Sequence, residues 1–127
     1  MRKLWVLVCA ASIALAACST RDEQYYRLNP QALQQAIKDC PNKQPAQISC
    51  EQLAAINSSV YELVYQIQIN PQEFGKQILS IQQELAKQRI VLKKNPKQPE
   101  LRKMIEENEQ CLAERLAIVR WLESPES

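Results

Sequence analysis

Four glutamates lie close together near the C-terminus, and their carboxyl groups are the first candidates for a catalytic site. They are Glu106, Glu107, Glu109 and Glu114. Two carboxyl groups that face each other across a cleft can hydrolyse a glycosidic bond, one as an acid and the other as a base or nucleophile. Here, however, the glutamates occupy polar positions of one amphipathic helix. We therefore predict that they face solvent and that the chain has no catalytic site.

The composition excludes several other kinds of site. The chain has 127 residues, with no histidine and one glycine, Gly75. A histidine-dependent triad, a histidine-containing zinc site and a glycine-rich phosphate loop are therefore impossible. We expect no metal, no cofactor and no small-molecule substrate.

The first 17 residues predict an export signal. Met1-Arg2-Lys3 is basic, and residues 4–17 form an uncharged, largely apolar run that ends in small side chains. This pattern is typical of a secretory signal peptide. The run is shorter than the roughly 20 apolar residues of a membrane-spanning helix. A buried core helix is the alternative, but an exposed N-terminus that is apolar on every face disfavours it.

The end of this run, Leu15-Ala16-Ala17-Cys18, resembles the lipobox of bacterial lipoproteins. In that family the cysteine thiol receives a diacylglycerol and the chain is cut before the cysteine. The resemblance implies that Cys18 is lipidated and anchors the protein to a membrane. Two or more acyl chains make an anchor durable, since each buried CH₂ contributes about 0.8 kcal/mol. Ser19 follows the cysteine, which implies an outer-membrane lipoprotein that faces the periplasm.

The mature chain, residues 18–127, is long enough for one domain with a modest core. Of the 16 basic residues, Arg2 and Lys3 precede Cys18, which leaves 14 basic residues against 14 acidic ones. A protein that binds nucleic acid needs a basic surface, so this near-neutral chain gives no reason to expect a nucleic-acid partner.

Three cysteines remain in the body of the mature chain: Cys40, Cys50 and Cys111. An exported protein meets an oxidising compartment, so we expect a disulfide. We favour Cys40–Cys50, because closing the short proline-containing loop between them is worth roughly 3 kcal/mol in the chain-entropy model. Cys111 would then be a half-buried residue that acts as a small hydrophobic side chain. A bridge from Cys111 to the N-terminal loop is the alternative.

The elements that position these residues are predicted to be helices, in an all-α bundle of three long helices preceded by one short helix. Asn29 is predicted to cap the short helix, Ser49 and Gln52 form a capping box, and Asn70 caps the helix that starts at Pro71. The chain is divided into a signal peptide at 1–17, a tether at 18–28, a helical bundle at 29–123 and a tail at 124–127. Within the bundle, helices are predicted at 30–39, from 49 to the turn at Asn70, at 71–94 and at 99–123.

Each predicted helix has an apolar face at helical spacing. The face of the second helix contains Leu53, Ile56, Val60, Leu63 and Ile67. That of the third contains Phe74, Ile78, Ile81, Leu85 and Leu92, with Gln88 as an interruption. That of the last contains Leu101, Ile105, Leu112, Leu116 and Val119.

Two groups of residues are candidates for interaction. The first is the pair Tyr25 and Tyr26, which either binds a partner or membrane interface or packs on the bundle. The second is a basic stretch that includes Lys93, Lys94 and Lys97, at the turn between the last two helices. This stretch could meet an anionic surface or an acidic partner, or it could simply be a solvated turn.

Residues 25–55 resemble the entry-exclusion (EexN-type) lipoproteins of conjugative plasmids. The resemblance consists of an aromatic pair in "YYRLNPQALQQAIKDC", a helix that ends in Cys40, and a second cysteine, Cys50, after a loop. The chain departs from the family pattern around Cys50, where Ser49 stands in place of the usual Asn. The resemblance implies a Cys40–Cys50 bridge and a link to type IV secretion.

Together these features predict a non-catalytic, lipid-anchored periplasmic protein that acts by binding another envelope protein, in a secretion or conjugation system. One alternative is a pilotin-like lipoprotein that targets or assembles an outer-membrane secretion subunit. A more remote alternative is a peptidoglycan-active enzyme that uses the C-terminal glutamates.

Overall fold

The computed structural model describes residues 21–43, 45 and 47–124, and the regular elements in these residues are all helices. They are α2 (Arg21–Leu28), α3 (Pro30–Asp39), α4 (Cys50–Ile69), α5 (Pro71–Lys94) and α6 (Pro99–Glu123). The all-α prediction is therefore confirmed for the described part of the chain. The predicted signal peptide, Cys18 and the end of the predicted tail lie outside the described residues.

Helix α2 occupies a segment that the sequence predicted to be tether. The tether prediction is wrong for Arg21–Leu28, so in the described part of the chain two short helices precede the three long ones. Asp22 and Glu23 in the first turn and Arg27 in the last turn suit the helix dipole. A helix this short is marginal alone, and it is stabilised here because Tyr26 packs against the core.

The polar signals at the helix ends explain why the predicted boundaries of the long helices hold. The Ser49 hydroxyl accepts from the Gln52 amide at 3.1 Å, and the Gln52 side chain accepts from the Ser49 amide at 2.8 Å. The Asn70 side chain accepts from the Glu73 amide at 3.1 Å. Both predicted caps are confirmed, and they satisfy amides that would otherwise lack partners.

Asn29 differs from its predicted role. Its side chain makes no capping hydrogen bond to α3. Instead its amide group donates to the Tyr25 carbonyl at 2.7 Å, at the end of α2. Because α2 continues to Leu28, Asn29 is the single residue between two helices, and its side chain serves the carbonyl end of the first.

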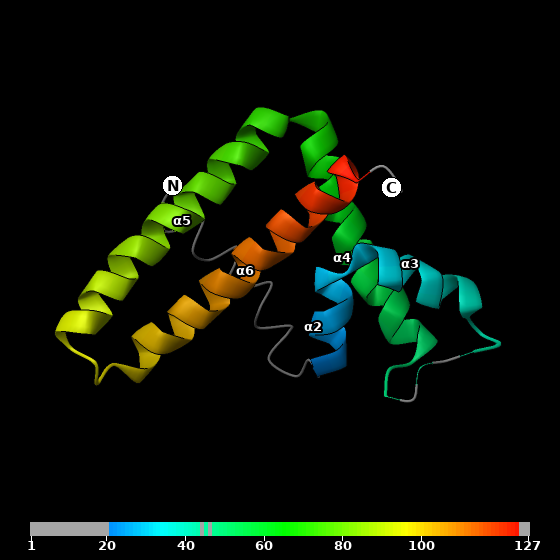
Figure 1. Cartoon of the computed structure of the whole chain (residues 1–127), viewed down its shortest axis with the longest axis horizontal. Helices are drawn as coiled ribbons and strands as arrows, with labels where there is room; N and C mark the ends of the chain where they lie inside the picture. The colour runs from blue at the N-terminus through cyan, green and yellow to red at the C-terminus, as the bar shows by residue number, and fades with distance from the viewer. Residues whose placement is uncertain (1–20, 44, 46, 125–127) are drawn as a thin grey trace.

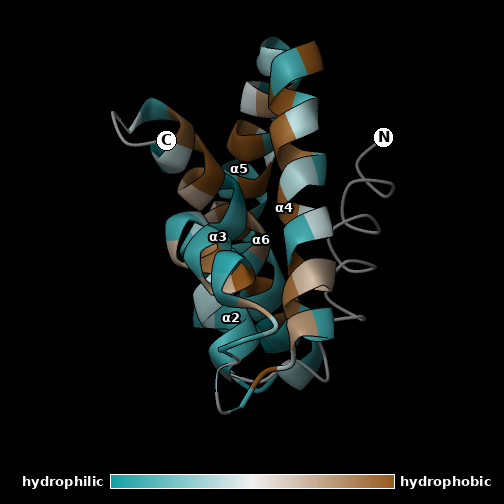
Figure 2. Ribbon diagram, turned by 90° about the vertical axis from the view of Figure 1, so that its right-hand side faces the viewer, coloured by the Kyte–Doolittle hydropathy of each residue, from teal (hydrophilic) through white to brown (hydrophobic). Residues whose placement is uncertain are grey.

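The five helices form a compact group at one end and a projecting hairpin at the other (Figure 1). Helices α4 and α5 meet at the turn around Asn70, and α5 and α6 then run antiparallel. Helices α2 and α3 pack against α4 and α6. Apolar and polar residues alternate along the helices in Figure 2, as expected of amphipathic helices that bury one face.

The first core lies where α3 and α4 pack against the end of α6. Its buried members are Leu33, Ile48, Leu53, Ile56, Val60, Val64 and Ile118. Leu33, Leu53 and Ile118 are fully buried. Leu63, which was predicted to lie on the inner face of α4, is only partly buried beside this core, and Val64 is buried instead. This first core joins helices from both ends of the chain.

The second core lies inside the α5–α6 hairpin. It contains Ile81, Leu85, Ile105 and Cys111, with Leu92, Leu101 and Leu112 packed around them. Cys111 is buried more deeply than the half-buried position predicted for it, and it is disulfide-bonded, so the expectation of an unpaired cysteine that acts only as a small hydrophobic side chain is wrong. The buried face of α6 comprises Ile105, Asn108, Cys111, Arg115, Ala117 and Ile118. Of the predicted face only Ile105 is buried, and its other members, Leu101, Leu112, Leu116 and Val119, are partly buried.

A disulfide joins Cys40, at the end of α3, to Cys50, at the start of α4. Their Cα atoms are 6.1 Å apart, within the usual range for a disulfide. The favoured pairing is thus confirmed, and the loop between these helices is closed covalently beside the first core. Among the described residues, no helix is long and apolar enough to span a bilayer.

Candidate functional site

The tyrosine pair lies in a hollow of about 650 Å³ between α2, α3 and the disulfide-closed loop. The hollow is lined by Tyr25, Tyr26, Ala32, Gln35, Ala36, Asp39, Asn42, Lys43 and Pro45. Residues from three consecutive segments meet here because Asn29 turns α3 back beside α2 and the disulfide holds the following loop to α4. The hollow therefore combines aromatic, small and charged side chains.

The two tyrosines have different roles. Tyr26 is partly buried and packs against the first core. Tyr25 is 52% exposed. The rings meet edge to face, with centroids 5.2 Å apart and planes at 76°, a favourable geometry for an aromatic pair. Tyr26 thus fixes the position of Tyr25, which is available for contact with a partner.

A second hollow, of about 670 Å³, lies on the other side of α3 and is walled by the end of α6. It shares Ala32 and Gln35 with the tyrosine hollow and adds Ala117, Arg120 and Trp121 from α6. We call the two hollows together the α3 surface. Sequence reasoning identified Tyr25 and Tyr26 but missed Arg120 and Trp121, because only tertiary packing brings the end of α6 beside α3.

The α3 surface is held from behind by contacts of several kinds. The Gln34 amide donates to the Asn57 side chain at 2.8 Å and links α3 to α4. In the loop, the Lys43 amide donates to the Asp39 carbonyl at 2.7 Å. Together with the disulfide, these bonds give the surface a largely preformed shape, which lowers the entropy lost when a partner binds.

Three of the four C-terminal glutamates, Glu106, Glu109 and Glu114, line a third hollow, of about 440 Å³, between α2 and α6. Glu106 and Glu109 are exposed, as predicted, whereas Glu107 and Glu114 are only partly exposed. Burial raises the pKa of Glu114, and the positive charges of Arg27 and Arg115 and a hydrogen bond from Gln110 act in the opposite direction. The expectation that all four glutamates face solvent is therefore wrong for Glu107 and Glu114.

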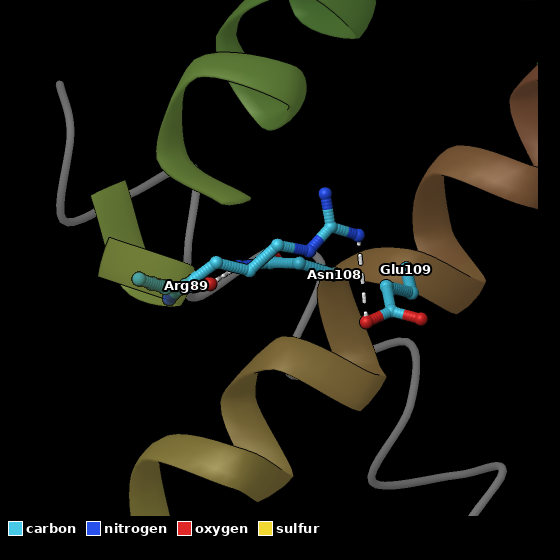
Figure 3. Close-up of polar contacts among 4 residues, drawn as sticks. Arg89, Asn108 and Glu109 are labelled. Atoms are coloured by element: carbon cyan, nitrogen blue, oxygen red, sulfur yellow. Dashed lines mark hydrogen bonds and ion pairs between the residues drawn. The ribbon is translucent and has the colours of Figure 1, made fainter. Parts of the chain in front are cut away.

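Two carboxylates of this third hollow, those of Glu109 and Glu114, take part in contacts that stabilise the structure. Gln110 donates to Glu114 at 3.4 Å and accepts from Gln24 on α2 at 3.3 Å. Glu109 forms an ion pair with Arg89 of α5, with 3.5 Å between the nitrogen and the oxygen (Figure 3). The Gln24–Gln110 hydrogen bond connects α6 to α2, and the Arg89–Glu109 ion pair connects α6 to α5.

Arg115 is a buried cation that the sequence did not reveal. Its guanidinium donates to the Cys111 carbonyl at 3.3 Å and to the Cys111 sulfur at 2.7 Å. Burial lowers the pKa of Arg115, and the neighbouring charge of Glu114 opposes this shift. Along α6, Arg115 lies between Cys111 of the second core and Ile118 of the first, at a buried position where an apolar residue would be expected.

The basic candidates lie far from the α3 surface. Lys93, Lys94 and Lys97 are exposed at the turn of the α5–α6 hairpin, which Figure 1 shows at the opposite side of the molecule from α3. The structure thus separates the tyrosine pair and the lysines into two surfaces. Among the described residues, no group of histidine, cysteine, aspartate or glutamate side chains could hold a metal ion.

Comparisons with protein-family models, with curated proteins and with solved structures give no match to this chain.

Proposed function

We propose that the protein is a non-catalytic, lipid-anchored component of the bacterial envelope that binds another envelope protein through its α3 surface. The observation that carries this proposal is the pair of adjoining hollows around Ala32 and Gln35, with Tyr25 exposed at one edge. In this proposal the three long helices act as a bundle that presents the two short helices to the partner.

The composition of the α3 surface favours a protein partner over a small substrate. Exposed tyrosine, tryptophan and arginine side chains are enriched where protein interfaces bind most strongly. Tyr25, Trp121 and Arg120 are spread across two open hollows, and the rim carries both Asp39 and Lys43. A segment of another protein can contact all of these groups at once, whereas a small molecule would fill only one hollow.

The resemblance to entry-exclusion lipoproteins supports a conjugation or type IV secretion system as the setting. The tyrosine pair, the helix that ends in Cys40 and the bridge to Cys50 are the features of that resemblance. The tyrosine pair and the end of that helix at Asp39 line the tyrosine hollow. In this proposal, lipid on Cys18 holds the protein at the outer membrane, facing the periplasm.

The anchoring is tested by changing Cys18 to Ala in cells. We expect the variant to leave the membrane fraction or to remain unprocessed, because the thiol that accepts lipid is lost. Persistence of a lipid-modified variant in the membrane fraction would contradict the assignment of Cys18.

Partner binding is tested by photo-crosslinking in cells that carry the transfer system. A photo-reactive phenylalanine analogue replaces Tyr25, and a matched control replaces Tyr65, which is similarly exposed on the outer side of α4. We expect an adduct with a component of the transfer machinery from position 25 and not from position 65. Equal adducts from both positions, or none from position 25, would overturn the proposal.

A pilotin-like function is a second candidate, and the hollow between α3 and α6 favours it. Such a protein would hold a segment of an outer-membrane secretion subunit in this groove. Trp121→Ala would then cause that subunit to be found in the inner-membrane fraction. If the subunit keeps its normal location while the Tyr25 adduct is lost in the Trp121→Ala variant, the groove serves another partner.

A further inference from the structure

The turn of the α5–α6 hairpin is strongly basic. We define the hairpin tip as residues 87–104. Its cations are Lys87, Arg89, Lys93, Lys94, Lys97, Arg102 and Lys103, and its one acidic residue is Glu100. All seven basic side chains are exposed. The hairpin tip therefore carries a large local positive charge, although the chain as a whole has a formal charge of only +2.

Most of this charge is uncompensated. Arg89 pairs with Glu109, and the Arg102 guanidinium donates to the Pro96 carbonyl at 2.7 Å. Within the described part of the chain, Lys93, Lys94 and Lys97 take part in no ion pair. Positive charges near the end of a helix are favourable for the helix dipole, but this effect is limited to the last turn. The helix dipole of α5 therefore does not explain the cations that follow Lys94, which are Lys97, Arg102 and Lys103.

Aliphatic side chains are exposed beside these cations. Ile90 is 57% exposed, Val91 48% and Met104 37%. Aliphatic groups are exposed elsewhere too, such as Ile69 and Leu79, but at the hairpin tip they lie within a few residues of several cations. Cationic and apolar side chains on one short segment are typical of protein surfaces that lie on a membrane interface.

The direction of the hairpin tip fits such a contact. Figure 1 shows the turn of the hairpin and the Arg21 end of α2 on the same lower side of the molecule, with the α4–α5 turn at the top. Cys18 precedes Arg21 by three positions in the sequence. A bilayer that holds lipid on Cys18 would lie near the start of α2, and the hairpin tip faces that side.

We infer that the hairpin tip is a second membrane contact, in which its lysines and arginines bind the phosphates of anionic phospholipids while Ile90, Val91 and Met104 enter the interface. This inference rests on the proposed lipid anchor for its orientation. Attraction between a basic segment and an anionic leaflet falls off within a Debye length, so the contact forms only when the anchor holds the tip near the surface.

The test uses the mature chain, residues 18–127, purified with its lipid and reconstituted into vesicles. Val91→Trp places a fluorescent reporter in the hairpin tip, and Ile69→Trp places one at the exposed end of α4, near the opposite turn. The vesicles contain either brominated phosphatidylglycerol with phosphatidylethanolamine or brominated phosphatidylcholine alone. The unchanged lipidated chain gives the signal from its own tryptophan, Trp121, because Trp5 is removed with the signal peptide.

We expect brominated anionic vesicles to quench the tryptophan at position 91 at least twofold more than the tryptophan at position 69. Phosphatidylcholine vesicles and 0.5 M salt should both remove this difference. Charge reversal by Lys93→Glu, Lys94→Glu and Lys97→Glu in the Val91→Trp chain should remove it as well, with circular dichroism unchanged. Lys76→Glu, an exposed lysine outside the tip, is the control and should leave it intact.

Equal quenching at positions 91 and 69 in anionic vesicles would overturn the inference. Equal quenching in anionic and phosphatidylcholine vesicles would overturn it too, because the basic charge would then have no role. Failure of the anchor is a distinct result, since chains without lipid on Cys18 are recognised by mass. Loss of the Tyr25 adduct with normal quenching at position 91 would count against the proposed partner alone.

Discussion

The two cores of this protein are built from helices of similar amphipathic pattern, but they are filled differently. The first core contains only hydrophobic side chains and lies beside the Cys40–Cys50 disulfide. The hairpin holds the polar pair Gln88 and Asn108 among its apolar residues, with the Asn108 amide donating to Gln88 at 3.1 Å. Figure 3 shows Asn108 beside the Arg89–Glu109 ion pair.

This difference indicates which region of the structure is more stable and which opens more readily. Of the buried polar atoms without a hydrogen-bond partner in the described part of the chain, Gln77 Oε1, Gln88 Nε2 and Arg115 Nε lie in α5 and α6, whereas Arg27 Nε lies in α2. Each such buried group costs stability, by about 1–3 kcal/mol when it is unsatisfied. We therefore expect the first core to set the stability of the domain and the hairpin to open more readily. The α3 surface, which is proposed to bind the partner, lies beside the more stable first core. The proposed membrane contact lies at the tip of the less stable α5–α6 hairpin.

The largest expected effect comes from a charge in the first core. Leu53→Glu places a carboxylate at a fully buried position, which costs several kcal/mol, a large part of the 5–15 kcal/mol that a domain usually has. Ala54→Glu, at the exposed neighbouring position, should change stability by no more than about 0.5 kcal/mol. Thermal melts followed by circular dichroism compare the two variants. Similar melting temperatures would contradict the burial of Leu53 in the first core.

The next effect comes from the disulfide. Replacing both Cys40 and Cys50 by Ser should lower the free energy of unfolding by roughly 3 kcal/mol, because the open loop gains entropy in the unfolded chain. Hydrogen exchange should become faster in α3 and the start of α4. If the free energy of unfolding is unchanged and hydrogen exchange accelerates more in the α5–α6 hairpin than in α3, the disulfide does not stabilise the first core.

A smaller effect is expected from the polar pair in the hairpin. Gln88→Leu alone leaves the Asn108 amide without its partner and should cost about 1–3 kcal/mol. Gln88→Leu with Asn108→Leu removes both polar groups and should restore most of this loss. A double-mutant cycle from denaturant melts measures the coupling. Additive losses would mean that the two side chains do not stabilise each other.

The helix boundaries could be predicted because local signals set them. Proline at the first helical position and the Ser49 and Asn70 caps act within a few residues, so the ends of α4 and α5 follow from the sequence. Helix α2 could not be predicted in this way, because its segment is polar and depends on packing by Tyr26. The inner face of α6 was misplaced because Asn108 and Arg115, two residues usually found in water, are buried there.

Some residues of the candidate site could likewise be predicted from local sequence, whereas others depend on tertiary packing. Tyr25, Tyr26 and the Cys40–Cys50 pair are close in sequence, so spacing was enough to single them out. Trp121 and Arg120 join the α3 surface only when the end of α6 returns to α3, and no local pattern reports that contact. The raised pKa of Glu114 likewise depends on α2 covering α6.

The smallest expected effect concerns Glu114 and the dependence of stability on pH. Because the pKa of this carboxyl is higher in the folded protein than its ordinary value of 4.5, the folded state holds the proton more tightly than the unfolded chain does. Stability from Glu114 is therefore present below that value and is lost as pH rises through the folded pKa. Glu114→Gln should be more stable than the unchanged chain at neutral pH, and the difference should vanish in acid.

Glu106→Gln is the matched control for this change, since Glu106 is exposed on the same helix and lines the same hollow. It should leave the pH profile of denaturant melts unchanged, and both variants should retain the Tyr25 adduct. The Arg27 charge offsets part of the burial of Glu114, which keeps the expected effect modest. A Glu114→Gln profile parallel to that of the unchanged chain would show that α2 does not cover this carboxyl in solution. Loss of function in a folded Glu106→Gln variant would instead favour the glutamate-based enzyme over the binding protein.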